Sequence, residues 1–227
     1  MKNRVITALF IVGIFLLGYF TFDGIGLGFL VLFCLFVAFM EVDYTMDALI
    51  WTLDPRACHP HNAFCYELVV LVMSAVASLF MSREELALVL CTSMLADVGA
   101  FAVGSLIGCH KVKFLAKISA SKSYEGFVGG ILVGAGTAYV VSLLTGLPLS
   151  PAVIAYIALG GLTASIGDLL GSATKRQLGV KDSGTLLSYR RVFNVIEAPM
   201  MGHGGYLDRF DSISLGLVLY GLLKWVF

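Results

Sequence analysis

The sequence has few charged residues for its length. Only 13% of its 227 residues are charged, whereas 59% are hydrophobic. A typical soluble domain carries about 25% charged residues. A chain of this size cannot hide so much apolar surface from water inside a single core. The composition therefore excludes an ordinary soluble protein and indicates that lipid is the solvent.

Three further absences narrow the class of protein. The formal net charge is zero, so there is no excess of basic residues to indicate a nucleic-acid partner. The five cysteines are odd in number and include no close pairs, so they do not indicate a disulfide framework. There is no internal repeat, low-complexity tract or proline-rich linker. We therefore expect a single membrane domain over 1–227, with N-terminal spans in 1–81 and a catalytic half in 82–227.

Apolar runs long enough to cross a bilayer recur along the whole chain. A spanning helix needs about 20 apolar residues, with backbone groups bonded inside the segment. The first run follows a basic N-terminus but ends without a small-x-small cleavage site, so we interpret it as an uncleaved span. The sequence predicts an all-α polytopic integral membrane protein of about seven transmembrane helices. The expected spans are 5–22, 24–40, 67–81, 86–108, 126–146, 151–171 and 207–226.

The basic residues lie almost entirely on one side of this arrangement. With the N-terminus inside, the internal loops are 41–66, 109–125 and 172–206. Of the 15 Lys and Arg residues, thirteen then fall on the cytoplasmic side, and only Arg83 and Lys224 fall outside. The positive-inside rule supports this orientation. We expect the N-terminus and the active site to face the cytoplasm, which means the cell inner membrane if the source is bacterial.

The third internal loop and its borders combine acids, bases and glycines. Asp168, Ser172 and Lys175 are spaced to share one helix face, and so are Asp208 and Asp211. Carboxylates at a membrane boundary are costly unless they are paired or bound to metal. Magnesium favours one or two carboxylates together with phosphate oxygens, and basic side chains neutralise phosphate. The alternative is a set of boundary salt bridges that cap helices, but simple anchoring does not need this density of acids, bases and glycines.

The order of these residues resembles a known family. The pattern S-x-x-K-R-x4-K-D-x-G, followed by H-G-G-x-x-D-R-x-D, is similar to the signature of the phosphatidate cytidylyltransferases, or CDP-diacylglycerol synthases. Its residues here are Ser172, Lys175, Arg176, Lys181, Asp182, Gly184, His203, Gly204, Gly205, Asp208, Arg209 and Asp211.

Two earlier stretches also resemble that family. Asp97 begins a run similar to the family's D-x-x-A-[YF] helix, and 118–126 is similar to its I-S-P-x-K-[TS]-x-E-G loop. The resemblance covers about residues 90–215. Gly126, Gly129, Gly130 and Gly134, which follow that loop, are spaced for close helix packing, and we assign them to packing alone.

The resemblance implies an activity. CTP and phosphatidic acid would give CDP-diacylglycerol and pyrophosphate, with magnesium as cofactor and two metal ions expected. The partners would be CTP, the lipid phosphate acceptor and membrane lipid. A homodimer is one possible oligomeric state. The implied metal ligands are Asp182, Asp208 and Asp211, with Asp168 as a further candidate. The implied phosphate-binding residues are Lys175, Arg176, Lys181 and Arg209. The implied substrate contacts are Asp97, Ser119, Lys122, Glu125, Ser172, His203, Gly204 and Gly205.

The sequence departs from the family pattern in two places. Residues 188–200 intervene before His203, with Met201 where proline is usual, and this puts the exact lipid acceptor in doubt. Ala120 replaces the usual proline of the second loop, which removes a fixed φ angle but no charge.

Other interpretations remain open. The first is a related CTP-dependent transferase or kinase that acts on another lipid acceptor, such as an ether lipid phosphate or a polyprenol. The second is a non-catalytic membrane protein that kept the loop. The Cys58-His59-Pro60-His61 run with Cys65 could bind zinc, but its spacing matches no common zinc pattern, so we interpret it as incidental.

Overall fold

The computed structural model describes residue 17, residues 19–21, residue 28, and residues 31–36, 61–110, 123–177 and 207–227. Within these ranges, the side chains of 61–67, 174–177 and 207–209 lie outside the description. The long elements are all helices. They are α3 (His61–Leu79), α4 (Arg83–Ile107), α5 (Tyr124–Thr145), α6 (Pro151–Gln177) and α9 (Leu207–Val226).

These five helices confirm the last five predicted spans as helical, and several run past the predicted bounds. Helix α4 starts three residues early because Ser82 and Glu85 form a capping box, in which each side chain bonds the other's backbone N–H. Helix α6 continues to Gln177, six residues beyond the predicted end of its span. Apolarity marks the hydrocarbon layer, whereas a helix can continue into the polar boundary. Ser172, Lys175 and Arg176 therefore lie on a helix.

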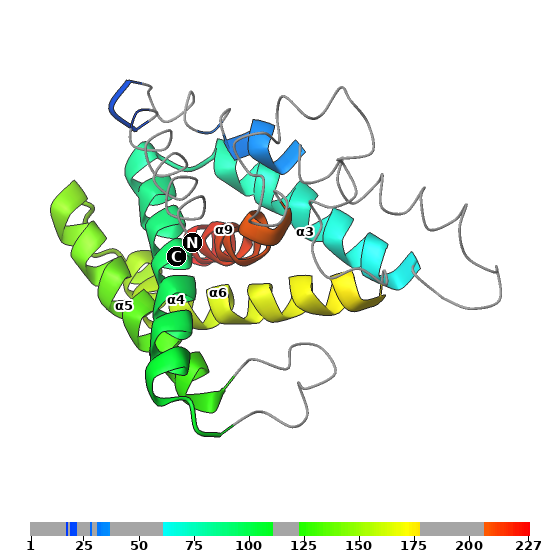
Figure 1. The fold of residues 1–227 in the computed structure, drawn as a ribbon. Helices are drawn as coiled ribbons and strands as arrows, with labels where there is room; N and C mark the ends of the chain where they lie inside the picture. The colour runs from blue at the N-terminus through cyan, green and yellow to red at the C-terminus, as the bar shows by residue number, and fades with distance from the viewer. Residues whose placement is uncertain are drawn as a thin grey trace.

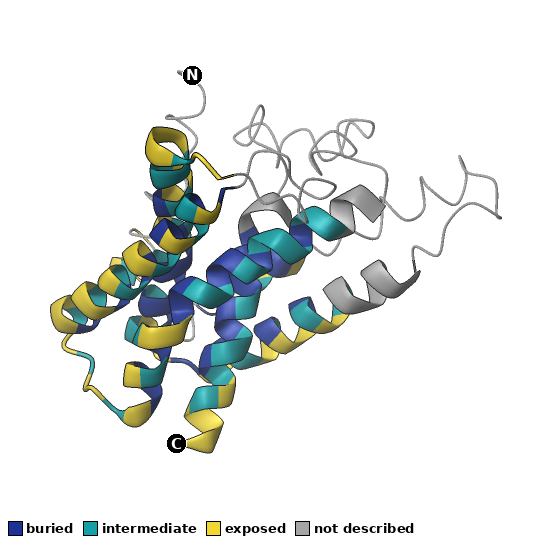
Figure 2. Ribbon diagram, turned by 90° about the horizontal axis from the view of Figure 1, so that it is seen from below, coloured by how far each residue is buried: buried dark blue, intermediate teal, exposed yellow. Residues whose placement is uncertain are grey.

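Three helices of the described part are long and apolar enough to cross a membrane. They are Arg83–Ile107, Tyr124–Thr145 and Pro151–Ala173. Exposed residues, many of them apolar, lie along the outer faces of the helices, while the buried residues lie toward the middle of the group (Figure 2). On α5, for example, Leu132 and Leu144 are largely exposed. Such surfaces suit a lipid environment, as expected for an integral membrane protein.

Helix α9 lies in the middle of the helical group, with α3, α4 and α6 beside it and α5 beyond α4 (Figure 1). The core between them contains Tyr156 of α6 and Tyr220 of α9, both fully buried, with their rings edge to face at 5.3 Å. Edge-to-face packing of this kind is favourable for aromatic pairs. The helix that carries Asp208 and Asp211 is thus enclosed on several sides by other helices.

Glycines bring α4, α5 and α6 into close contact, as the spacing on the fifth span predicted. A methyl group at Gly129 would lie 2.6 Å from Cβ of Val103, and one at Gly134 would lie 2.5 Å from Cα of Gly161. Gly126 and Gly130 similarly approach the backbone of α4. Small residues at such contacts let backbones approach closely, which is a main source of packing energy between helices in lipid.

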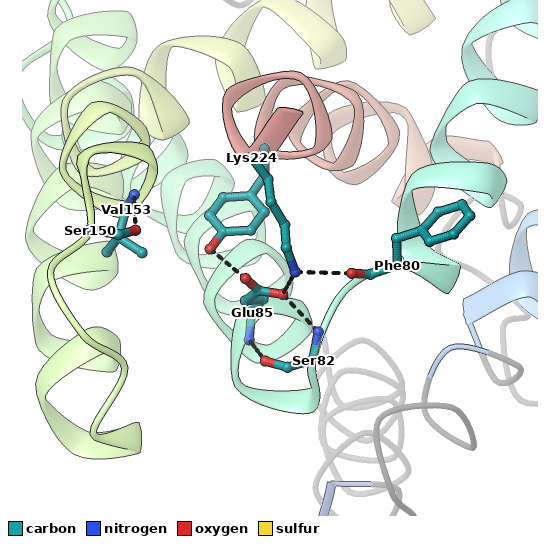
Figure 3. A network of polar contacts seen from close by, with 7 residues as sticks. Phe80, Ser82, Glu85, Ser150, Val153 and Lys224 are labelled. Carbon is teal, nitrogen blue, oxygen red and sulfur yellow. Dashed lines mark hydrogen bonds and ion pairs between the residues drawn. The ribbon is translucent and has the colours of Figure 1, made fainter. Parts of the chain in front are cut away.

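A polar network holds the C-terminal end of α9 against α3 and α4 (Figure 3). Lys224 donates to a carboxylate oxygen of Glu85 at 2.7 Å and to the carbonyl oxygen of Phe80 at 3.0 Å. The Tyr220 hydroxyl donates to the other Glu85 oxygen at 3.1 Å. The same carboxylate accepts the backbone N–H of Ser82. Glu85 therefore joins the start of α4 to the end of α9, about 20 Å along α9 from Asp211.

Candidate active site

Two acidic side chains meet at one serine near the N-terminal end of α9. The hydroxyl of Ser212 donates to Oδ2 of Asp97 on α4, at 2.9 Å. The backbone N–H of Ser212 donates to Oδ1 of Asp211 at 2.7 Å. Asp211 and Ser212 are both buried, and Asp97 lies inside a helix long enough to span the membrane. Ionisable groups at such depth are costly and usually functional, which marks this cluster as the candidate site.

Helix α6 supplies the floor under Asp211. A methyl group at Gly171 would lie 2.6 Å from Cβ and 2.9 Å from Cγ of Asp211. One at Gly167 would lie 2.6 Å from the backbone oxygen of Asp211 and 2.8 Å from Cα of Ser212. Real side chains essentially never approach this closely, so both positions require glycine. The carboxylate of Asp211 is therefore held against the bare backbone of α6.

The predicted residues of α6 lie on the same part of this helix. Asp168 and Ser172 each directly follow one of the two glycines, and both are partly buried. Lys175 and Arg176 are in the last turn of α6, and Asp208 and Arg209 are in the first turn of α9. Their side chains lie outside the description. Because both segments are helical, the predicted spacings do place residues on one helix face. On α9 this is the three-residue spacing from Asp208 to Asp211, and on α6 it is the spacing of four and then three residues through Asp168, Ser172 and Lys175.

Glu125 has a partner in the structure that the sequence did not predict. Its carboxylate accepts the backbone N–H of His110 at 3.2 Å and lies 2.6 Å from the ring Nδ1 of the same residue. The N–H of Tyr124 also donates to the carbonyl oxygen of His110, at 3.1 Å. These bonds close the base of the loop that carries Ser119 and Lys122. The predicted contact of Glu125 with substrate stays a prediction.

The remaining predicted site residues lie outside the described residues. They are Lys181, Asp182, His203, Gly204, Gly205, Ser119 and Lys122. The zinc alternative also falls there in part, since only the backbone of His61 and Cys65 is described.

The described residues alone do not complete a metal site. Among them, no three His, Cys, Asp or Glu side chains converge closely enough to hold an ion. The donor chemistry nevertheless fits magnesium, which needs only one or two carboxylates when phosphate oxygens and water fill the remaining positions. Asp211 is fixed from two sides, and Asp168 lies on the adjoining helix α6.

Sequence reasoning missed three residues of this site. Gly167 and Gly171 form the floor under Asp211, and Ser212 links Asp211 to Asp97. The two glycines are four residues apart, so the same small-xxx-small spacing that was used for α5 could have identified this contact. Nothing in the sequence alone indicated the link made by Ser212, because it depends on α4 lying beside α9.

Fold and site together define a helical membrane protein with acidic side chains gathered at the N-terminal end of its central helix. Residues 48–227 match the model of the Cytidylyltransferase family. This match covers most of the chain, including the whole of the candidate site, and the chain belongs to that family.

Several curated relatives carry the name phosphatidate cytidylyltransferase. The chain is 39% identical to the one from Bacillus subtilis over 129 residues, which are 56% of this chain and 42% of that protein. It is 32% identical to the one from Staphylococcus saprophyticus over 166 residues, 71% of this chain and 58% of that protein. It is 37% identical to the one from Mycobacterium leprae over 120 residues, 52% of this chain and 33% of that protein. The chain thus matches less than two thirds of the length of these relatives. No solved structure matches it.

Proposed function

We propose that this protein transfers CMP from CTP to phosphatidic acid, giving CDP-diacylglycerol and pyrophosphate, in a magnesium-dependent reaction for phospholipid biosynthesis. The observation that carries the proposal is the family match over 48–227, because it contains the complete ordered set of acids, bases and glycines. The relatives named phosphatidate cytidylyltransferase support the same reaction.

The reaction exchanges one phosphoanhydride bond for another. A phosphate oxygen of phosphatidic acid attacks the α-phosphorus of CTP and forms the new P–O bond. The bond from the α-phosphorus to the oxygen that bridges to the β-phosphate breaks, and pyrophosphate leaves with that electron pair. No covalent enzyme intermediate is required. The protein has to align the two phosphates and offset negative charge, which are positioning and electrostatic tasks.

The proposed roles are those that the resemblance to the phosphatidate cytidylyltransferase signature implies. Bound magnesium would offset the charge of the triphosphate and of the leaving pyrophosphate. The proposed metal ligands are Asp168, Asp182, Asp208 and Asp211. The proposed phosphate-binding residues are Lys175, Arg176, Lys181 and Arg209. Proposed contacts to the nucleotide or the lipid phosphate are Ser119, Lys122, Glu125, Ser172, His203, Gly204 and Gly205.

The close packing of α6 and α9 supports this assignment. Lys175 and Arg176 follow Gly171 by one helical turn on α6, and Asp208 precedes Asp211 by about one turn on α9. Gly171 touches Asp211, so the C-terminal end of α6, with the proposed basic residues, adjoins the N-terminal end of α9, with the proposed acidic residues. A triphosphate with bound magnesium needs this combination of carboxylates and cations.

We also propose the complete membrane topology that the sequence predicted. It has seven spans, with the N-terminus and the site on the cytoplasmic side. The thirteen-to-two distribution of Lys and Arg supports this orientation.

A direct assay tests the reaction. Purified protein in detergent would be incubated with CTP labelled at the α-phosphate, magnesium, and a panel of lipid phosphates. We expect a labelled CDP-lipid with phosphatidic acid and release of unlabelled pyrophosphate. A product with an ether lipid phosphate alone would reassign the acceptor, and label transfer to no lipid in the panel would contradict the proposal.

A substitution tests the metal role within the same assay. Asp208→Asn keeps the size of the side chain and removes its charge, so we expect at least a roughly 100-fold loss of rate and a higher magnesium requirement. The rate should be measured across a magnesium titration. An unchanged rate and unchanged magnesium dependence would show that Asp208 is not a ligand.

A further inference from the structure

Ser212 links two carboxylates that come from different helices. Its hydroxyl bonds Asp97 of α4 at 2.9 Å, and its backbone N–H bonds Asp211 of α9 at 2.7 Å. The side chain is buried, with 1% of its surface exposed, so water does not compete for these bonds. A hydrogen bond to an ionised acceptor is stronger than one between neutral groups. The serine is therefore held by Asp97, and its own N–H holds one oxygen of Asp211.

The opposite side of Asp211 is fixed by α6. The side chain of Asp211 fills the position that a methyl group would take at Gly171. The backbone of Asp211 and Cα of Ser212 fill the corresponding position at Gly167. The Asp211 carboxylate is thus confined between the Ser212 N–H and the surface of α6. Groups that orient a metal-binding carboxylate from behind strongly affect its affinity for the ion, although they do not touch the ion.

We propose that Ser212 is a positioning residue, anchored by Asp97, that sets the orientation of the Asp211 carboxylate for a divalent cation and its bound nucleotide. The inference rests on the proposed function, in which Asp211 is a metal ligand. It gives Asp97 a different task from substrate contact. The carboxylate of Asp97 acts through the Ser212 hydroxyl, which joins the middle of α4 to the acid on α9.

The test compares two serines of the same helix. Ser212→Ala removes the hydroxyl that bonds Asp97. Ser214→Ala is the matched control, because Ser214 is equally buried but its hydroxyl bonds the backbone oxygen of Asp211, not a carboxylate. The full-length proteins in detergent would be titrated with Mn²⁺ and free ion measured by electron paramagnetic resonance. We expect Ser212→Ala to bind Mn²⁺ about 10- to 100-fold more weakly, and Ser214→Ala to bind it as the wild type does.

A second readout separates positioning from a purely structural role. In the labelled CTP assay, the Ser212→Ala protein should require a magnesium concentration about 10-fold higher, or more, to reach half of its maximal rate. At saturating magnesium, much of the wild-type rate should be recovered. A structural role would instead lower the melting temperature and leave the Mn²⁺ affinity unchanged, and that result would overturn the proposal.

Asp97 provides an independent variant if Ser212→Ala folds poorly. Asp97→Asn keeps an oxygen that can accept the Ser212 hydroxyl, whereas Asp97→Ala does not. We expect Asp97→Asn to retain clearly tighter Mn²⁺ binding than Asp97→Ala. Equal losses in the two variants would mean that the Asp97 charge itself is needed, which would overturn the role assigned to it here.

The outcomes distinguish this proposal from the proposed function. If the wild type makes no CDP-lipid but Ser212→Ala still weakens Mn²⁺ binding, the reaction is wrong and the positioning role stands. If the wild type is active and Ser212→Ala binds Mn²⁺ normally, the reaction stands and the positioning role fails. A wild-type protein that binds no Mn²⁺, with or without CTP, would overturn the positioning role directly.

Discussion

At the residue scale, the contact between Gly171 and Asp211 is a strict steric constraint. No other residue type fits at position 171 without moving the carboxylate, because even a methyl group would lie 2.6 Å from Cβ of Asp211. This steric limit explains a glycine near the end of a helix, where alanine would otherwise be the better helix former. The space that glycine leaves is occupied by the acid itself.

Gly171→Ala should therefore reduce activity more than stability. The added methyl group displaces the Asp211 carboxylate, and misplacement of a reacting group by about 1 Å can reduce the rate about 100-fold. The measurement is CDP-lipid formation, with melting temperature recorded in parallel. Gly136→Ala on α5 is the control, since a methyl group there meets nothing within 4 Å. Equal activity of the two variants would contradict the close contact.

At the scale of the elements, the α5–α6 contact tests how much glycine packing contributes to the fold. Gly134→Val places a side chain where Cα of Gly161 lies 2.5 Å away, so the helices have to separate. Overpacking of this kind costs about 1–3 kcal/mol. Thermal unfolding in detergent should show a lower melting temperature than for Gly136→Val on the exposed side of the same helix. A destabilisation no larger than that of Gly136→Val would argue against the packing described here.

The pair of Glu85 and Lys224 gives a second prediction for the elements. Only 12% of the Glu85 side chain is exposed, so Lys224→Met leaves a largely buried carboxylate without its cation. The double variant Glu85→Gln, Lys224→Met removes that charge as well. We expect the double variant to be less destabilised than the sum of the two single variants, Lys224→Met and Glu85→Gln. The difference should give a coupling energy of about 1 kcal/mol in a double-mutant cycle. Strictly additive effects on thermal unfolding would contradict an energetic link between the two residues.

The sequence predicted the elements better than the contacts between them. Seven spans were predicted as helices because long apolar runs in lipid have to satisfy their backbone bonds internally, and the last five of them are long helices in the described residues. Helix α9 matched at both ends, while α6 ran on to Gln177 because a helix does not stop where its apolar face stops. The glycine spacing on α5 indicated packing, but the partners Val103 and Gly161 come from other helices and could not be identified from one chain segment.

The same limit applied to the candidate site. Asp97 could be identified as a functional candidate from its position within an apolar span. Asp211 could be identified from its spacing with Asp208 at the membrane boundary and from the family pattern. Their connection through Ser212 spans 115 residues of sequence, so no local pattern encodes it. The partner of Glu125 was missed for the same reason, because His110 lies 15 residues away across a loop. Residue type and spacing indicate which groups carry chemistry, and tertiary packing decides which of them meet.

At the scale of the whole molecule, the proposed orientation can be tested with a native thiol. Cys109 follows α4, is exposed, and is not in a disulfide. We expect a membrane-impermeant maleimide to label it in inside-out vesicles and not in intact cells. Cys58 and Cys65, which lie in the predicted internal loop 41–66, are first replaced by serine in every protein compared, so that Cys109→Ser should abolish that labelling. Leu149→Cys, introduced into the Cys109→Ser protein, lies in the loop between α5 and α6 and should show the opposite pattern. Labelling of Cys109 from outside intact cells would reverse the topology.

The anchor at the C-terminal end of α9 has a consequence for how such sequences change over time. Glu85 caps α4, accepts the Tyr220 hydroxyl and pairs with Lys224, so its loss leaves a cation and a hydroxyl without their shared acceptor. In a lineage that loses Glu85, replacing Lys224 as well removes the unpaired cation and restores stability. In a lineage that keeps Glu85, selection favours a cation near position 224. We therefore expect the two positions to vary together among relatives, although they lie at the opposite end of α9 from Asp211.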